Sequence, residues 1–77
     1  MNSETADFRI KLGLRIAQLR SIKGLTQQEL AFRMGHRDRQ VINRYEKEGA
    51  NPTAFILLQL ADALGTSVDD ILDFSKL

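Results

Sequence analysis

The sequence predicts an all-α fold of five helices in a single domain. Apolar residues recur with the 3.6-residue period of an α-helix, and no segment sustains the alternation that is typical of a strand. Glycines or polar capping residues flank the periodic segments, and the only proline is Pro52. We expect helices near residues 7–22, 27–34, 39–47, 53–64 and 68–73.

The first helix carries its apolar residues on one stripe, which consists of Phe8, Leu12, Ile16 and Leu19. Gly24 follows at a position suited to a C-terminal cap, and Gly13 weakens the helix slightly. The preceding residues 1–7 are polar and acidic. We therefore expect a flexible N-terminal tail over residues 1–7 and a single domain over residues 8–77.

The second helix has a specific start signal. Thr26 and Glu29 have the spacing of a capping box, in which each side chain bonds the backbone amide of the other residue. Leu30 and Ala31 then face inward, and Gly35 ends the helix. This spacing predicts a short helix followed by a turn.

The third helix shows the sharpest division between an apolar and a polar side. Asp38 is the expected N-cap, because its carboxylate can accept hydrogen bonds from amides two or three residues on. At about 100° per residue, Val41, Ile42 and Tyr45 cluster on one side, and Glu46 lies on the border. The opposite arc carries Arg39, Gln40, Asn43, Arg44 and Lys47. We expect one side to dock on the core and the other to meet solvent or a ligand.

The last two helices follow a loop at residues 47–52. The expected core stripe of the fourth helix consists of Leu57, Leu60, Ala61 and Leu64. Gly65 ends this helix and Ser67 caps the fifth. The expected inward residues of the fifth helix are Val68, Ile71 and Leu72.

Length and composition restrict the class of protein. The chain has 77 residues and no cysteine, so its stability has to come from helix packing and from any partner subunit. No apolar run is long enough to span a bilayer, and the acidic amino end is unlike a signal peptide. We expect a soluble cytoplasmic protein that does not associate with membranes.

Charge is distributed unevenly along the chain, although the net charge is only +1. Residues 9–47 hold ten basic and three acidic side chains, whereas the rest of the chain holds one basic and seven acidic side chains. The basic part is a candidate surface for a polyanion, and the acidic part would be repelled by phosphate. An ordinary solvated surface is the alternative, because blocks of like charge are common on helices.

The central motif resembles a known family. The run Leu25-Thr26-Gln27-Gln28-Glu29-Leu30-Ala31 is followed by Gly35, then by the apolar anchor Ile42, and then by Glu46, Gly49 and Pro52. This order resembles the Cro/repressor-type (XRE-like) helix-turn-helix family, whose motif runs roughly Thr-Gln-x-Glu-Leu-Ala, Gly, an apolar anchor, then Glu, Gly and Pro. The resemblance covers residues 12–72. It implies a compact, repressor-like bundle that binds double-stranded DNA.

The outward arc of the third helix offers the side chains that base reading requires. Arginine suits guanine, and asparagine and glutamine suit adenine. Matched to the family through the apolar anchor, the expected base contacts are Arg39, Gln40, Asn43 and Arg44. A charged surface helix without a partner is the alternative.

The resemblance also implies contacts to the DNA backbone. The family uses a glutamine at the position of Gln27 to contact a phosphate and to buttress the recognition helix, and the free amides and dipole of a helix start favour an anion there. A plain first-turn polar residue is the alternative for Gln27. Looser candidates for phosphate contacts are Lys23, Arg37, Lys47 and Asn51.

One pair of residues has an expected structural role. Arg20 and Glu46 match positions at which the family often pairs an arginine late in the first helix with a glutamate late in the third. Such a pair would hold the third helix against the first. We therefore expect Arg20 not to touch DNA, despite its charge.

The chain departs from the family pattern around the turn. One extra residue lies between the turn glycine and the apolar anchor, and one more follows the glutamate. If the first insertion changes the angle of the third helix, Arg37 replaces Arg39 as the leading contact. His36 lies in this turn and is expected to be an exposed loop residue or a phosphate contact, since a lone histidine without a cysteine is not a metal site.

Several apolar side chains lie outside the expected core, and they indicate a surface that binds a partner. They are Phe55, Ile56 and Leu58 on the fourth helix, with Phe74 and Leu77 beyond the fifth. The family commonly forms two-fold dimers through its last helices, which places two recognition helices about 34 Å apart on successive major grooves. The alternative is that Phe55 or Phe74 folds back to complete a thin core.

These features predict a sequence-specific, repressor-like transcriptional regulator that binds a roughly palindromic operator as a homodimer. No catalytic set, cofactor motif or metal site is visible, so we expect no enzyme activity and no cofactor. Regulation would act through occupancy, by blocking RNA polymerase or touching it from an adjacent site. The alternatives are an antitoxin with a toxin partner, a restriction-modification controller, or a protein-docking module that has lost DNA binding.

Overall fold

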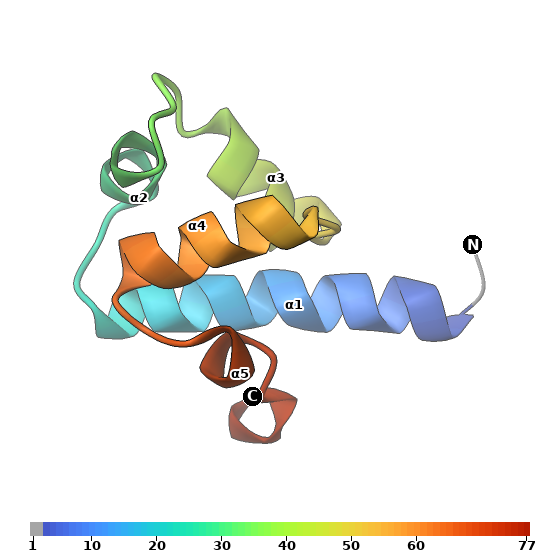
Figure 1. Ribbon diagram of the computed structural model, residues 1–77. Coiled ribbons are helices and arrows are strands. Elements are labelled where there is room, and N and C mark those ends of the chain that lie inside the picture. The colour runs from blue at the N-terminus through green and yellow to red at the C-terminus, as the bar shows by residue number, and fades with distance from the viewer. Residues whose placement is uncertain (1–2) are drawn as a thin grey trace.

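Residues 3–77 are described by the structure, a computed structural model in which that range forms helices and connecting turns but no strand (Figure 1). Its elements are α1 (Ser3–Ile22), α2 (Gln27–Arg33), α3 (Gln40–Glu48), α4 (Ala54–Leu64), α5 (Val68–Ile71) and a 3₁₀ turn, η1 (Phe74–Lys76). The predicted all-α class and its five α-helices are confirmed. No helix within residues 3–77 is both long and apolar enough to cross a membrane.

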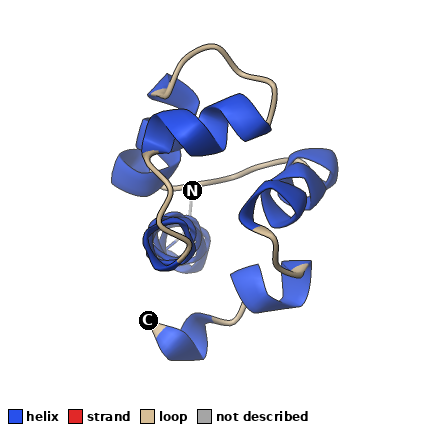
Figure 2. Ribbon diagram, turned by 90° about the vertical axis from the view of Figure 1, so that its left-hand side faces the viewer, coloured by secondary structure: helices blue, strands red, loops and turns tan. Residues whose placement is uncertain are grey.

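The long helix α1 is the element around which the others are arranged, as the view along it in Figure 2 shows. α3 packs against α1, as do α5 and η1, while α4 packs against α2 and α5. The centre is filled by Leu12, Ile16, Leu30, Ile42, Leu60, Leu64 and Ile71, whose side chains are fully buried. Every α-helix contributes at least one of these side chains, so the shared core holds α2 and α3 in place.

Side-chain caps fix the starts of three helices. The Thr26 hydroxyl accepts from the Glu29 amide at 3.0 Å, and the Glu29 carboxylate accepts from the Thr26 amide at 3.0 Å, which confirms the predicted capping box. The same bonds with Thr26 lower the pKa of Glu29 and keep it charged at the positive end of α2. Thr53 and Ser67 cap α4 and α5 with one bond each, in which the hydroxyl accepts from the amide three residues on.

The amino-terminal part of the chain differs from the prediction. α1 begins at Ser3 instead of Asp7, so residues 3–7 of the expected flexible tail belong to the helix, while residues 1–2 lie outside the described range. Phe8 was expected to face the core, but its side chain is 44% exposed. Its ring instead contacts the edge of the Phe74 ring, with centroids 5.6 Å apart, because η1 reaches back along α1.

Two helix ends also differ from their predicted positions. α3 begins at Gln40, and Asp38 is not its N-cap, although the Asp38 carboxylate accepts from the Gln40 amide at 2.8 Å. The N-cap position is taken by Arg39, whose side chain makes no capping bond. α5 ends at Ile71, so Leu72 lies beyond the helix and is exposed instead of facing inward.

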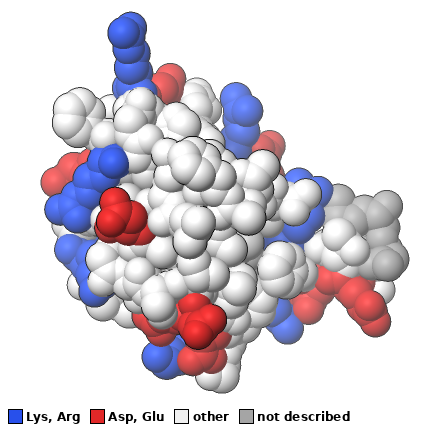
Figure 3. Space-filling model, viewed as in Figure 1, with Lys and Arg blue, Asp and Glu red and all other residues white. Residues whose placement is uncertain are grey.

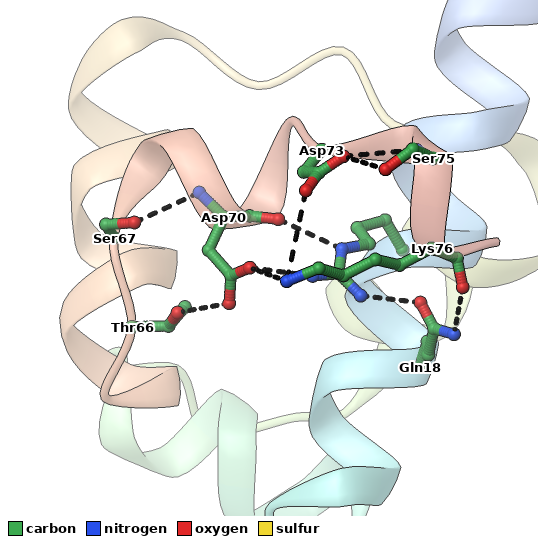
Figure 4. Close-up of polar contacts among 8 residues, drawn as sticks. Gln18, Thr66, Ser67, Asp70, Asp73, Ser75 and Lys76 are labelled. Carbon is green, nitrogen blue, oxygen red and sulfur yellow. Dashed lines mark hydrogen bonds and ion pairs between the residues drawn. The ribbon is translucent and has the colours of Figure 1, made fainter.

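Arg15 is a buried residue that the sequence pattern did not reveal. Its side chain is 2% exposed, and its guanidinium donates to the backbone oxygen of Asp70 at 3.0 Å, to the Asp70 carboxylate at 2.9 Å and to Gln18 at 2.6 Å. The Asp70 carboxylate also accepts from Thr66 at 2.7 Å and from Lys76 at 3.2 Å. Figure 4 shows Gln18 of α1, Thr66 of the connection before α5, Asp70 of α5 and Lys76 of η1 converging on this point. This Asp70 cluster anchors the carboxyl-terminal segment on α1.

The helices α1 and α3 approach each other closely at Gly13. A Cβ atom on Gly13 would overlap the carbonyl oxygen of Tyr45. One turn earlier in α1, the carbonyl of Arg9 accepts from the Ala50 amide at 2.8 Å, which ties down the chain just after α3. Gly49 has a φ of 99° at this point, a conformation that glycine adopts without strain. Gly13 thus costs some helix propensity but lets α3 lie directly on α1.

Replacing Gly13 with Ala is expected to lower the free energy of unfolding by about 2 kcal/mol, because α1 and α3 must separate to admit the methyl group. The gain in helix propensity, about 1 kcal/mol, offsets only part of this loss. Urea denaturation followed by circular dichroism measures the change. Ser21→Ala, on the exposed side of α1, is the control and should stay within about 0.5 kcal/mol of the parent. An unchanged stability of Gly13→Ala would contradict the close packing of the two helices.

The Asp70 cluster predicts a specific pH dependence. Hydrogen bonds from Thr66, and then from Lys76, lower the pKa of Asp70 below its ordinary value. A carboxyl whose pKa is lower in the folded than in the unfolded chain stabilises the fold above the unfolded pKa, about 3.9. That stabilisation disappears as the pH falls through the folded pKa. We expect Asp70→Asn to be less stable than the parent at neutral pH and to lose less stability on acidification.

Denaturation midpoints measured from pH 7 to pH 2.5 test this expectation. Asp69→Asn removes the adjacent, exposed carboxylate and serves as the matched control. If the acid loss is as steep in Asp70→Asn as in the parent, another carboxyl is responsible for it.

Candidate nucleic-acid interface

α3 is held by its apolar side and leaves its polar side accessible. Ile42 is fully buried, and Val41 and Tyr45 are half-buried against the core. α3 contacts both α1 and α2 through this side. Of the four predicted base contacts, Arg39, Gln40 and Arg44 are exposed and Asn43 is half-buried. The predicted division of α3 into a docked and an open side is therefore present.

Charged side chains of both signs are spread over the face seen in Figure 3. Basic side chains project farthest at the upper edge, where Figure 1 places α3 and its connection to α2, with acidic groups beside them. Acidic side chains are prominent at the lower edge, around α5 and the carboxyl-terminal turn, where basic groups also lie. The projecting basic side chains can attract a polyanion.

The predicted contact between Arg20 and Glu46 is present. Arg20 Nε donates to Glu46 Oε2 at 2.7 Å and Arg20 Nη2 donates to Glu46 Oε1 at 3.1 Å, which makes a two-pronged ion pair. Arg20 Nη1 donates to the backbone oxygen of Leu25 at 2.7 Å. The hydrogen bond to Glu46 raises the pKa of Arg20, so the guanidinium stays charged. Arg20 thus joins α1 to α3 and uses its donors inside the protein.

Gln27, predicted as a phosphate contact, is placed against α3. Its side-chain nitrogen donates to Glu46 Oε1 at 2.9 Å and to Asn43 Oδ1 at 3.3 Å. The side chains of Arg20, Glu46, Gln27 and Asn43 therefore form one chain of hydrogen bonds, here called the Arg20–Asn43 relay. The resemblance anticipated its first pair and a supporting contact of Gln27 with the third helix, but not the bond to Asn43, a predicted base contact.

The other predicted backbone contacts lie at exposed positions. Lys23 follows α1, Arg37 lies between α2 and α3, Lys47 is in the last turn of α3, and Asn51 is in the next loop. The carbonyl of Arg37 accepts from the Gln28 side chain at 3.2 Å, which holds the lengthened turn against α2. The structure thus leaves all four side chains accessible without bringing them into one cluster of contacts.

The turn between α2 and α3 differs from its prediction at His36. The residue is half-buried, and its Nε2 atom is buried without a hydrogen-bond partner among residues 3–77. Together with Gln28, Phe32 and Arg37 it lines an open hollow of about 410 Å³. Phe32 is 75% exposed there, a feature that the sequence reading did not single out. In the described part of the chain, no group of His, Asp and Glu side chains is arranged to hold a metal ion.

The predicted partner surface divides into two parts. Phe55 and Leu58 on α4 are 67% and 60% exposed, and Leu77 is also exposed. Ile56 and Phe74 are half-buried and pack against the core. Phe74 therefore folds back toward α1, as one alternative predicted, whereas Phe55 does not.

Comparisons with known proteins agree with this geometry. The sequence model of the family described as "Helix-turn-helix" matches residues 16–71, from within α1 to the end of α5. The chain is 43% identical over 61 residues to the uncharacterized HTH-type transcriptional regulator y4dJ of Sinorhizobium fredii, which covers 79% of this chain and 78% of the relative.

Two solved structures share the fold. The restriction-modification controller protein C.AhdI from Aeromonas hydrophila matches with a TM-score of 0.75 and 36% identity, over 86% of this chain and 97% of the controller. The clp gene regulator ClgR from C. glutamicum matches with a TM-score of 0.79 and 28% identity, over 90% of this chain and 88% of the regulator. The similarity thus extends over nearly the whole arrangement of helices.

Proposed function

The chain belongs to the Cro/repressor-type (XRE-like) helix-turn-helix family of DNA-binding transcriptional regulators, and we propose that it binds the major groove of its DNA site as a homodimer. One observation carries the proposal. α3 is fixed by the buried Ile42 and by the Arg20–Glu46 ion pair, and it keeps an open side rich in guanidinium and carboxamide groups. A rigid helix with such a side has the size and chemistry that a major groove accepts.

Sequence recognition comes from the open side of α3. Arg39 and Arg44 are suited to guanine, and Gln40 and Asn43 to polar edges of the other bases. Arg39 and Gln40 lie at the start of α3, and Asn43 and Arg44 lie one turn later, so both pairs project from one side of the helix. This arrangement supports contacts to several successive base pairs of one half-site.

Affinity comes mainly from neutralised phosphates. The cations proposed for this role are the exposed Lys23, Arg37 and Lys47, and the exposed, neutral Asn51 is proposed to donate a hydrogen bond to a phosphate. Each neutralised phosphate releases counterions, so binding should weaken steeply as the salt concentration rises.

A DNA-binding role also requires the compartment that holds the genome, and we propose on that ground that the protein acts in the cytoplasm.

Dimerisation gives the operator its symmetry. The exposed Phe55 and Leu58 of α4, extended by Leu77, supply an apolar surface that a second copy can cover. A two-fold dimer would set two α3 helices about 34 Å apart, which suits a roughly palindromic site. We propose a repressor-like action in which the bound dimer blocks RNA polymerase.

A restriction-modification controller is the second candidate function. The observation that favours it is the 36% identity to C.AhdI, over 97% of that controller. A nuclease gene and a methyltransferase gene beside the coding sequence would support this function, and a promoter of the operon itself would then be the bound site.

Replacing Arg39 with Ala is expected to weaken binding to the selected site by about 1–3 kcal/mol and to relax preference at one base pair. Arg37→Ala is the matched comparison, because it should weaken binding equally on all sequences and reduce the salt slope by about one. Selection from a random DNA pool, followed by titrations at two salt concentrations, measures both effects. A uniform loss for Arg39→Ala would make Arg39 a phosphate contact, and no sequence preference in the parent would end the proposal.

Replacing Phe55 with Glu is expected to weaken dimerisation at least about tenfold, because a carboxylate would be buried in an apolar contact. Affinity for the palindromic site should fall in parallel, whereas affinity for a half-site should not. Phe32→Glu changes an equally exposed aromatic residue on α2 and serves as the control. Sedimentation equilibrium measures the association, and an unchanged constant for Phe55→Glu would remove α4 from the interface.

A further inference from the structure

The turn that precedes α3 carries one carboxylate between two cations. Asp38 lies between Arg37 and Arg39, and all three residues are exposed. It is the only acidic residue at positions 30–45, the segment that leads into the open side of α3. Within residues 3–77 its carboxylate makes one hydrogen bond, from the Gln40 amide at 2.8 Å, and no ion pair with either arginine. This charge weakens the attraction for a polyanion, so it lowers DNA affinity unless a group on the DNA donates to it.

Two hydrogen bonds hold Asp38 at the start of α3. The Gln28 side-chain nitrogen donates to the carbonyl of Arg37 at 3.2 Å, which fastens the turn to α2. The Gln40 amide donates to Asp38 Oδ1, which keeps the carboxylate beside the first turn of α3. Arg39 and Gln40, two of the proposed base contacts, lie at this same end of the helix. The carboxylate is therefore fixed next to the end of α3 that is proposed to enter the major groove.

A carboxylate in the major groove has few possible partners. Its oxygens only accept hydrogen bonds, and the charge on the phosphates repels it. Guanine presents two acceptors in the groove, and thymine presents an acceptor and a methyl group, so neither base donates. Adenine presents an amino group beside the acceptor N7, whereas cytosine presents its amino group alone. Cytosine is therefore the base that suits a carboxylate best.

We infer that Asp38 is a specificity-determining residue, which accepts a hydrogen bond from the amino group of one cytosine in each half-site. The inference rests on the proposed function, because it adds one base contact to the helix that is proposed to enter the groove. The Gln40 bond positions the carboxylate through Oδ1, and Oδ2 has no partner within residues 3–77, so it is available to the base. The charge thereby lowers affinity for DNA in general and restores it at sites that present the cytosine.

The test compares four proteins by selection from a random DNA pool and by titration at two salt concentrations. They are the parent, Asp38→Asn, Asp38→Ala and the matched control Glu48→Gln, which removes an exposed carboxylate at the other end of α3. The parent should prefer cytosine at one position of each half-site by about tenfold. Asp38→Asn keeps a side-chain oxygen for the Gln40 amide, so it retains the bond at the start of α3 and changes the charge.

In Asp38→Asn the preference for cytosine at this position should fall at least about fivefold, because a neutral group that also carries N–H donors replaces the carboxylate. Affinity for non-specific DNA should rise about threefold, because one negative charge near the phosphates is removed. Glu48→Gln should keep the parental preference at this position.

A role for Asp38 in capping alone gives a different result. Asp38→Asn would then keep the parental preference at every position, and Asp38→Ala would lose affinity equally on all sequences. Either outcome overturns the inference and leaves the proposed function in place. A parent without any sequence preference would overturn the proposed function, and the inference with it.

A change in the DNA tests the same contact from the other side. N4-methylcytosine still pairs with guanine, but it carries a methyl group in place of the N–H that faces the major groove. At the preferred cytosine it should weaken binding by the parent about tenfold and binding by Asp38→Ala no more than about twofold. An equal loss in both proteins would mean that another residue meets this amino group, and it would overturn the inference while DNA binding itself stands.

Discussion

The direct contact of α3 with α1 is the constraint on which the rest of the molecule depends. A nine-residue helix is too short to be stable alone, so α3 exists because other elements hold it. Gly13 lets the two backbones meet, the Ala50 amide bonds the Arg9 carbonyl just beyond α3, and Ile42 fills the core below. Because the docked side supplies most of the contacts that hold α3, the other side can carry exposed polar groups.

Internal bonds divide the basic residues into two groups. Arg15 and Arg20 are engaged internally, Lys11 pairs with Asp7 at 3.1 Å, and Arg33 donates to the carbonyl of Ala63 at 3.1 Å. The exposed cations near α3 then include Arg37, Arg39, Arg44 and Lys47. The surface that a polyanion would meet is therefore smaller than the basic segment of the sequence, and it is centred on α3 and the turn before it.

Most of the fold could be predicted from local sequence signals, whereas features that depend on contacts between distant residues could not. The Thr26–Glu29 capping box and the apolar side of α3 depend on residues within one or two helical turns, so the sequence displays them directly. The burial of Arg15 depends on Asp70, which is 55 residues away, and no helical period reveals such a partner. Gly13 looked like a weak point of α1 for the same reason, since its neighbour Tyr45 belongs to another helix.

The Arg20–Asn43 relay links the docked side of α3 to its polar side. The net contribution of a half-buried pair such as Arg20 and Glu46 is small, because desolvation offsets most of the attraction. Its bonds nevertheless fix a direction, since Glu46 accepts only and thereby decides which end of the Gln27 amide faces α3. The same Gln27 nitrogen donates to the Asn43 side-chain oxygen, so the direction extends to the polar side of α3. The network therefore fixes the orientation of these side chains more than it adds to the free energy of unfolding.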